Sequence, residues 1–464
     1  MEREKKFDVR PEFSLPPLAG ARLETHQLHA TYFDTDDGLL QARGVTLRRR
    51  RGGSDDGWHL KVPHPEGKLE LHADGGSTKP PPELTSVARG LRLDQPLRQQ
   101  AILKTVREAH RLYTSEGGLV AEVADDRVCA TVGSTGETVR WREIEIELGP
   151  AGSLDAMQRL VGQLTEAGAS PSTGGSKYAR AVGAPLTHRW TGIAGVIDDY
   201  LQTQYERLAW GDLRMRCGEN AVHKTRVAVR RCRSTLRIFS ILFDETRTAH
   251  LDAELKWYAQ ALGTVRDLDV ARRLLEQDLD SAPETSISHA AAAGLIGSLE
   301  DAREHAWKHL LDVLDGQRYG YLLRELADWR REAHWTRATA DDPDAADCVW
   351  TLVKRARKKS DKRLADAEST ADDAIDEALH RARKAAKRTR YAAELARPIM
   401  GKKAKRTAKA HEQRQDVLGT TQDHRMVAAV LHDLAGKHAT SSDVAFACGI
   451  LAERHNHAKE RARR

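Results

Sequence analysis

Cysteine is scarce in this sequence, and no two cysteines have the spacing of a metal or redox motif. The five cysteines lie far apart and form no CxxC pair: Cys129, Cys217, Cys232, Cys348 and Cys448. Their distribution argues against a cysteine-based zinc site and against a disulfide framework. A reducing compartment fits best, so we expect the protein in the cytoplasm.

Long apolar runs and aromatic side chains are also in short supply. No apolar segment follows the charged N-terminus, and no apolar run approaches the roughly twenty residues that a membrane span needs. Aromatic residues make up only 5% of the chain, and we find no base-stacking or groove-reading motif, which disfavours nucleic acid as a partner. The sequence predicts a soluble protein with no membrane partner.

The excess of positive charge is small for a chain of this length. The 464 residues include 74 basic and 68 acidic ones, which leaves a formal net charge of +6. Any preference for anions must therefore come from local clusters of charge. With an apolar fraction of 40%, the chain can form two or three domains with ordinary cores.

Two compositional regimes divide the chain. Up to about Gly183, glycine-rich turns separate short alternating segments, which predict antiparallel strands at 31–34, 45–51, 58–62, 69–72, 119–132 and 140–148. After Pro185, long stretches rich in alanine, leucine and arginine have a helical period. We therefore expect an α+β multidomain chain, with a β domain at 1–183 and an all-α domain at 190–464.

The expected strands carry charges of one sign each. In 47–51, Arg48 and Arg50 share one face, and in 58–62 Lys61 and His59 oppose the apolar residues. The strand at 142–148 presents three carboxylates on one face: Glu143, Glu145 and Glu147. A merely solvated face usually mixes the two signs. A closed sheet with a polar interior explains the sorting, because it makes a cavity for a polyanion and a divalent metal.

A triphosphate requires this combination of side chains. Its charge of about −4 to −5 calls for several lysine or arginine donors. Mg²⁺ or Mn²⁺, as hard cations, need carboxylate oxygens beside the phosphates. Attack of water on the terminal phosphoryl group then requires mainly positioning and neutralisation of charge.

The N-terminal residues add a further charged face. Glu2, Glu4 and Lys6 recur at every second position, and Glu2-Arg-Glu-Lys-Lys6 resembles the ExExK signature of the CYTH family, the triphosphate tunnel metalloenzymes. Further matches follow in the family's order at 32–36, 47–50, 58–61, Arg107, 122–127, 143–147 and 176–178. The resemblance covers roughly the first 183 residues.

The resemblance implies an eight-stranded antiparallel tunnel that hydrolyses triphosphates, with some relatives cyclising ATP. It assigns Mg²⁺ or Mn²⁺ to Glu2, Glu4, Asp126, Glu143 and Glu145. It assigns phosphate to Lys6, Arg48, Arg50, Lys61, Arg107 and Lys177. Glu147 either ligates the metal or activates water, so the catalytic set is Glu2, Glu4, Lys6 and Glu147.

Two points of the assignment stay open at the level of sequence. Glu122 and Asp126 share one face of their strand and Asp125 the other, and we favour Asp126 as the inward acid. The segment 68–72 departs from the family's tendency toward arginine, which leaves the substrate contacts of this hairpin undetermined. No nucleobase pocket is readable, so inorganic triphosphate is favoured over nucleotide cyclisation.

The helical half carries a second signal. His223, Arg226, Arg230, Arg233 and Arg237 are spaced 3, 4, 3 and 4 residues apart and form one basic stripe. The spacing recurs through His380, Arg383, Lys387 and Arg390. In each copy a related segment follows downstream, Leu-Gly-Thr-Val-Arg-Asp at 262–267 and Leu-Gly-Thr-Thr-Gln-Asp at 418–423. These repeats indicate an internal duplication.

From about residue 190 onward the chain resembles the CHAD domain, the conserved histidine α-helical domain. The resemblance implies two pseudo-symmetric four-helix units around a basic groove that binds inorganic polyphosphate. We expect the contacts at His223, Lys224, Arg226, Arg230, Arg231, Arg233, His380, Arg383, Lys384, Lys387, Arg388 and Arg390. Each histidine either contacts phosphate or is buried for structural reasons, and Asp267 and Asp423 can orient neighbouring cations.

Three hypotheses follow. The leading one is a metal-dependent triphosphatase whose helical domain binds polyphosphate, in the cytoplasm or on polyphosphate granules. The second is a non-catalytic polyphosphate-binding or targeting protein, and the third is a nucleic-acid binder, which competition between nucleic acid and polyphosphate would reveal. A cyclase-like use of the tunnel and a homodimer are left open.

Overall fold

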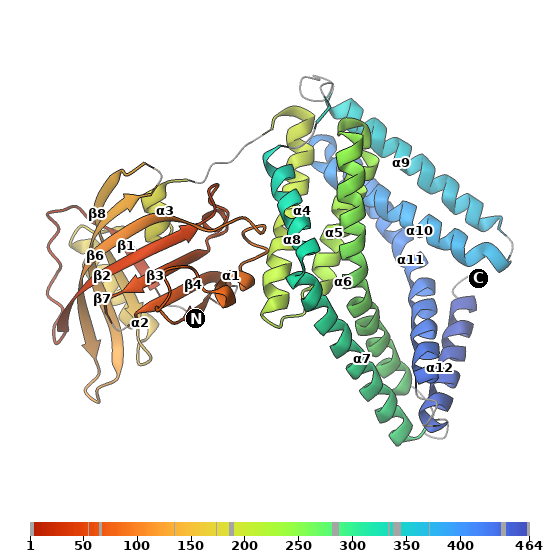
Figure 1. The fold of residues 1–464 in the computed structure, drawn as a ribbon, viewed down its shortest axis with the longest axis horizontal. Helices are drawn as coiled ribbons and strands as arrows, with labels where there is room; N and C mark the ends of the chain where they lie inside the picture. The colour runs from red at the N-terminus through yellow and green to blue at the C-terminus, as the bar shows by residue number, and fades with distance from the viewer. Residues whose placement is uncertain are drawn as a thin grey trace. The chain divides into compact units, whose positions relative to one another are not determined.

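The computed structural model describes most of the chain. It covers residues 4–53, 55–64, 67–133, 135–172, 174–184, 190–280, 287–332, 335–336, 345–370, 372–437 and 442–461. The chain divides into two compact units, Met1–Thr187 and His188–Arg464, which are drawn in Figure 1. The finer domain limits, 1–183 and 190–464, stay a prediction.

The first unit is built on one antiparallel sheet. Its strands are β1 (Glu4–Asp8), β2 (Arg22–Asp34), β3 (Thr46–Arg51), β4 (Gly57–His64), β5 (Gly67–Ala73), β6 (Arg98–Tyr113), β7 (Leu119–Val132), β8 (Thr138–Leu148) and β9 (Ser170–Pro171). Their order is β5-β4-β3-β2-β6-β7-β8-β1-β9. The family resemblance predicts eight strands, and the two-residue β9, which pairs with β1, makes nine in the described part.

The strands alternate between an apolar face and a polar face. In β8, Ile144 and Ile146 are fully buried and pack with Met157 and Leu160 of helix α2 (Leu154–Glu166). The glutamates at 143, 145 and 147 fall on the opposite face because side chains alternate along a strand. The apolar face therefore forms the core, and the polar face is left to build a site.

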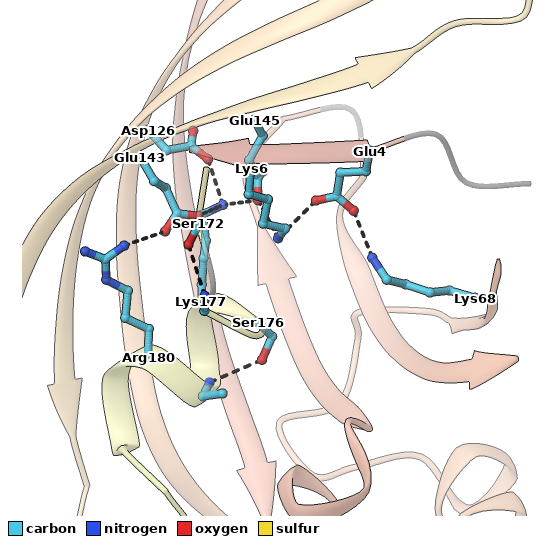
Figure 2. Close-up of polar contacts among 12 residues, drawn as sticks. Glu4, Lys6, Lys68, Asp126, Glu143, Glu145, Ser172, Ser176, Lys177 and Arg180 are labelled. Atoms are coloured by element: carbon cyan, nitrogen blue, oxygen red, sulfur yellow. Dashed lines mark hydrogen bonds and ion pairs between the residues drawn. The ribbon is translucent and has the colours of Figure 1, made fainter. Parts of the chain in front are cut away.

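The sheet curls so that its ends approach each other. Strands β5 and β1 lie near opposite ends of the sheet order. Even so, Lys68 Nζ of β5 is 2.8 Å from Glu4 Oε2 of β1 (Figure 2). The polar face is thus turned inward, as the charge sorting predicts.

Two short helices complete the unit. Helix α1 (Pro82–Val87) begins with proline at its first position. Helix α3 (Lys177–Val182) is capped by Ser176, whose Oγ accepts a hydrogen bond from the Ala179 backbone N–H at 3.2 Å. The ring of Tyr178 stacks on Tyr32 of β2, with centroids 5.1 Å apart. This stacking fixes α3 against the sheet and positions Lys177.

The second unit is helical, and the α+β class predicted from the sequence is confirmed. Its helices are α4 (Gly192–Arg216), α5 (Val222–Ile238), α6 (Glu245–Asp280), α7 (His289–Asp315), α8 (Gln317–Arg331), α9 (Ala345–Glu368), α10 (Asp372–Leu395), α11 (Arg397–Lys437) and α12 (Ser442–Arg461). Helix α11 is kinked at Gly401, where φ is 52° and ψ is −124°. Among these helices, none carries an apolar stretch long enough to span a bilayer.

Contacts between helices repeat across the two copies. Helix α5 packs on α10, α6 on α11, α7 on α12 and α4 on α9 (Figure 1). In α5 an apolar stripe with the helical spacing is fully buried, from Val222 through Val229, Cys232 and Leu236 to Phe239 just beyond the helix. Burial of that stripe leaves the neighbouring basic stripe at the junction of the two copies.

Candidate functional site

A cavity of about 590 Å³ lies on the polar face of the sheet. Most of the residues singled out from the sequence line it: Glu4, Lys6, Arg48, Arg50, Lys61, Arg107, Asp126, Glu145, Glu147 and Lys177. Glu143 lies directly behind this wall, 5% exposed, and Glu2 falls outside the described residues. Strands far apart in sequence therefore bring opposite charges into one enclosed space.

Three carboxylates gather on β7 and β8. Asp126 pairs in register with Glu143, and Glu145 follows on the same face. Each offers an oxygen within 4.8 Å of the others. Oxygen donors at this spacing fit a hard divalent cation, so Asp126, Glu143 and Glu145 could hold a metal ion.

The ammonium of Lys177 occupies the centre of this carboxylate group. Its Nζ lies 2.7 Å from Glu143, 2.7 Å from Glu145 and 3.0 Å from Asp126 (Figure 2). Burial alone would lower the pKa of Lys177, but the attraction of the three carboxylates outweighs it and raises the pKa. Lys177 thus supplies the positive charge that these buried acids require.

The remaining acid from the N-terminal motif has other partners. Glu4 Oε1 lies 3.0 Å from Lys6 Nζ, and Glu4 Oε2 lies 2.8 Å from Lys68 Nζ. Burial favours the neutral acid, but Lys6 and Lys68 hold the pKa of Glu4 below its usual value. Glu4 is therefore an ionised carboxylate in the wall, bound to lysines rather than grouped with the three acids.

The inward acid of β7 is resolved by its contacts. Arg107 donates to both oxygens of Asp126, from Nε at 2.8 Å and from Nη2 at 2.6 Å, and the same Nη2 also donates to Glu145 at 2.8 Å. Asp125 points to the other face and pairs with Arg142 at 2.6 Å. Asp126 is the acid that joins the cavity, in agreement with the choice favoured from the sequence.

The cations of β3 and β4 differ in how they are satisfied. Arg50 pairs with Asp55 at 3.1 Å, and Lys61 pairs with Glu70 at 3.0 Å. The buried Nε of Arg48 has no hydrogen-bond partner in the described structure. A buried guanidinium donor without an acceptor is costly, and an anion bound in the cavity would satisfy it.

Three charged residues of the cavity were not assigned a role from the sequence: Asp55, Lys68 and Glu70. Glu70 pairs in register with Lys61 across the β4–β5 hairpin. Burial would raise the pKa of Glu70, but His59 and Lys61 lower it to about 2. The alternation of side chains along 68–72 could have predicted that Lys68 and Glu70 share one face of their strand. Asp55 lies in a turn, where no regular spacing predicts the direction of a side chain.

In the helical unit, the two basic stripes face each other. Burial and mutual repulsion lower the pKa values of Arg226 on α5 and of Arg383 on α10. The same causes, burial first and then Arg383, Arg230 and Arg226, lower the pKa of Lys387 to about 7. The Nε atoms of Arg230 and Arg383 are buried without a hydrogen-bond partner. The cluster is short of negative charge.

The duplicated Leu-Gly-Thr segments shape this cluster. A Cβ on Gly263 of α6 would lie 3.3 Å from the Arg226 guanidinium, and a Cβ on Gly419 of α11 would lie 3.3 Å from that of Arg383. Arg226 lies 3.5 Å from Asp267. In the other copy, Arg383 lies 3.9 Å from Asp423. Each glycine leaves room for an arginine, and each aspartate orients it.

Two cavities open beside the stripes. The larger, about 1130 Å³, is lined by Arg226, Arg230, Arg233 and Lys384, among others. The second, about 460 Å³, is lined by Arg237, Lys384 and Arg388 together with cations of α9: Arg355, Lys359 and Arg363. The basic run of α9 was not assigned a role from the sequence, although its clustered lysines and arginines gave the signal.

Not every predicted contact residue reaches these cavities. Arg231 donates to Glu394 at 2.8 Å and lies over the ring of Tyr391, and Arg390 pairs with Glu394 at 2.9 Å. Lys224 and His223 are exposed, and His380 is half-buried. The exposure of His223 speaks against a buried structural role for that histidine. Arg231 instead joins helix α5 to α10, whereas Arg390 pairs within α10 and also reaches Glu412 of α11 at 2.7 Å.

Both units match known protein families. A model of the CYTH domain matches residues 1–168, and a model of the CHAD domain matches residues 199–432. Uncharacterized proteins from two strains of Mycobacterium tuberculosis are 32% identical over 493 residues, covering 100% of this chain and 94% of theirs. This coverage extends the relationship across both domains.

Solved structures resemble the units separately. PptA from Streptomyces chartreusis is 21% identical with a TM-score of 0.48, and the match covers 59% of this chain and 97% of PptA. The CHAD domain of the plant Ricinus communis is 23% identical with a TM-score of 0.46, and the match covers 59% of this chain and 94% of that domain. A Hippeastrum protein, described as a putative adenylyl cyclase with a dominant triphosphatase activity, covers 39% of this chain and 94% of its own (22%, TM-score 0.25).

Removal of the Lys177 ammonium should destabilise the β unit. We expect Lys177→Met to lower the free energy of opening of β8 by about 3–5 kcal/mol in metal-free buffer, since the buried acids lose their counter-charge. Added Mn²⁺ should restore more stability in this variant than in the native chain. Hydrogen exchange of peptides from β8 measures both effects.

The matched control is Lys5→Met, which removes an exposed lysine from β1. Equal stability and an equal response to Mn²⁺ in the Lys177→Met variant and the native chain would contradict the expected role of Lys177.

The low pKa of Lys387 predicts that binding of a polyanion such as polyphosphate beside this lysine would take up a proton. Near pH 8 much of Lys387 is neutral in the free protein, and a bound polyanion raises its pKa. Affinity for polyphosphate should therefore fall as the pH rises above 7. Calorimetry in buffers of different ionisation enthalpy gives the number of protons taken up.

Lys387→Arg keeps the charge at all these pH values, so the variant should bind with less proton uptake and a flatter pH profile. If its proton uptake equals that of the native chain, Lys387 is not the titrating group.

Proposed function

The chain belongs to the CYTH and CHAD families, and from the chemistry of its cavities we propose a two-part function. The β unit is a metal-dependent triphosphatase that acts on inorganic triphosphate, and the helical unit binds inorganic polyphosphate. The observation that carries the first part is the convergence of opposite charges in one cavity, where the donor on Arg48 lacks an acceptor.

In this proposal each side of the cavity has a separate task. A Mg²⁺ or Mn²⁺ ion held by Asp126, Glu143 and Glu145 would neutralise phosphate oxygens and make the terminal phosphorus more electrophilic. Arg48 and Arg50 on β3 bind and orient the triphosphate.

The cations now paired with acids change partner when the triphosphate enters. Arg50 exchanges Asp55 for phosphate oxygens, and Lys61 exchanges Glu70 in the same way. Arg107 and Lys177 keep the buried acids ionised until then, because both hold Glu145 in its charged form. Burial would otherwise raise the pKa of Glu145, which instead lies well below its usual value.

Glu147 accepts the proton of the attacking water in this scheme. Its position on the acidic face of β8 places it in the cavity wall. The water oxygen bonds to the terminal phosphorus while the bridging P–O bond breaks, so orthophosphate and diphosphate leave. The negative charge of the leaving diphosphate is matched by the cations of β3 and β4.

The lining favours inorganic triphosphate over a nucleotide. Among the described residues that line the cavity, Tyr32 is the only aromatic one, and its ring already stacks on Tyr178. No aromatic face in that wall is left to stack on a base. This arrangement counts against cyclase-like use of the cavity.

The helical unit fits a polyanion for a different reason. Its two stripes leave Arg230 and Arg383 with buried donors that lack acceptors, and no metal-type group of acids was found among its described residues. Polyphosphate supplies a continuous row of oxygens at the spacing such cations need. This supports metal-independent binding of a polyphosphate chain there, and a purely non-catalytic tether remains the second candidate.

The triphosphatase part is tested by Arg48→Gln. We expect kcat/KM for release of phosphate from inorganic triphosphate, with Mg²⁺ or Mn²⁺, to fall by roughly 10- to 100-fold, because one charged hydrogen bond is lost. The control is Arg51→Gln, an exposed arginine of the same strand. Equal losses in the two variants would contradict a role for Arg48. A native chain without activity in either metal would favour the tether.

The polyphosphate part is tested by Arg230→Gln, with Lys308→Gln of α7, whose side chain is 67% exposed, as the control. Arg230→Gln should weaken polyphosphate binding by roughly 10-fold or more while triphosphate hydrolysis stays unchanged. Displacement of polyphosphate by nucleic acid at equal phosphate concentration and physiological salt would instead support a nucleic-acid partner.

A further inference from the structure

We infer a second metal site in the β unit, formed by Asp55, His59 and His72, that binds a borderline transition-metal ion such as Zn²⁺ or Co²⁺. These residues lie on and beside the β4–β5 hairpin, and they are not among the three acids on β7 and β8. The inference does not rest on triphosphate hydrolysis, since it concerns binding of the metal alone.

The fold brings the three side chains together. His59 of β4 and His72 of β5 are directly paired across the hairpin, and their ring centroids are 4.5 Å apart. Asp55 lies in the turn that leads into β4, and its carboxylate faces the ring of His59 four residues later. One ligand atom from each of the three residues lies within 4.8 Å of the other two.

The separations between ligand atoms suit a shared ion. Asp55 Oδ1 is 3.5 Å from His59 Nε2 and 4.0 Å from His72 Nδ1. Zinc bonds of about 2.0–2.2 Å in a tetrahedron put neighbouring ligand atoms roughly 3.3–3.6 Å apart. The observed distances are close to that range, and His72, with 55% of its side chain exposed, can close the remaining gap.

The ring of His59 is surrounded by oxygen acceptors. Its ring is 1% exposed, yet both nitrogens face acceptors: Nδ1 lies 3.1 Å from Glu70, and Nε2 faces the backbone and side-chain oxygens of Asp55 at 3.3 and 3.5 Å. A neutral imidazole donates from one nitrogen only. A metal ion bound at Nε2 would therefore fit between His59 and Asp55, with the N–H of Nδ1 donated to Glu70.

Glu70 suits the role of the group that orients a metal-bound imidazole. Histidine ligands commonly donate their other ring N–H to a carboxylate, which fixes the ring. Glu70 accepts at Nδ1 of His59, so Nε2 is left to face Asp55 and the ion. The second oxygen of Glu70 stays with Lys61, 3.0 Å away, so Glu70 is fixed in turn.

The donor set selects the metal. Two imidazoles and one carboxylate suit Zn²⁺, Co²⁺ or Ni²⁺, whereas Mg²⁺ prefers oxygen ligands throughout. The hairpin and the carboxylate group on β7 and β8 should therefore bind different ions at the same time. Asp55 connects the two regions, because its other oxygen, Oδ2, pairs with Arg50 in the cavity wall at 3.1 Å.

Titration of the full-length chain with Co²⁺, in the presence of excess Mg²⁺ and without triphosphate, tests the inference. Four-coordinate Co²⁺ absorbs strongly in visible light, so the spectrum reports binding at the hairpin independently of activity. We expect the native chain and Glu145→Gln to develop the bands with one Co²⁺ per chain. His72→Ala should weaken this binding at least about tenfold, since one of three ligands is lost.

His72 is the residue to change because it is exposed, so its substitution should not unfold the sheet. His64→Ala, another exposed histidine of the same hairpin, is the matched control and should bind Co²⁺ like the native chain. Equal binding by His72→Ala and the native chain overturns the inference. So does a native chain that develops no bands at millimolar Co²⁺.

Discussion

The constraint on which both units depend is the need to compensate like charges that the fold buries together. In the β unit, Asp126, Glu143 and Glu145 are brought within reach of one another by strand register, and Lys177 enters from α3 to balance them. The stacking of Tyr178 on Tyr32 holds that helix in place. The acidic group thus keeps its negative charge although it is buried, and a hard cation requires such charged oxygen ligands.

In the helical unit the like charges that are buried together are positive, and they are not fully compensated by acids. Packing of α5 on α10 joins two copies of one basic stripe. Asp267 and Asp423 face one arginine in each copy, and Asp252 pairs with Arg233 and Arg237. Burial together with repulsion then lowers the pKa of Lys387. The duplication explains why the excess of positive charge is similar in the two copies: each copy contributes a glycine, an arginine and an aspartate in the same arrangement. A surface with this excess of positive charge suits a polyanion, as the proposed function requires.

The sequence predicts those parts of the site that depend only on the alternation of side chains along a strand. Alternation in β3, β4 and β8 identified Arg48, Lys61 and the glutamates of the acidic face, all of which the structure brings to the cavity region. The strand β6, which carries Arg107, was not expected because its consecutive apolar residues Ala101–Leu103 break the alternation. Asp55 and the His59–His72 pair depend on a turn and on cross-strand register, which a single sequence does not specify. Arg231 belongs to the right helix but faces Glu394, because its position falls off the stripe.

The account's central claim is that the chain has two anion sites, one that needs a divalent metal and one that does not. The most direct test is to measure, in the same full-length preparation, hydrolysis of inorganic triphosphate and binding of long-chain polyphosphate before and after removal of divalent ions by a chelator. The account predicts that hydrolysis stops, returns with added Mg²⁺ or Mn²⁺, and that polyphosphate remains bound throughout. Hydrolysis that persists without metal, or polyphosphate binding that is lost with it, would contradict the account.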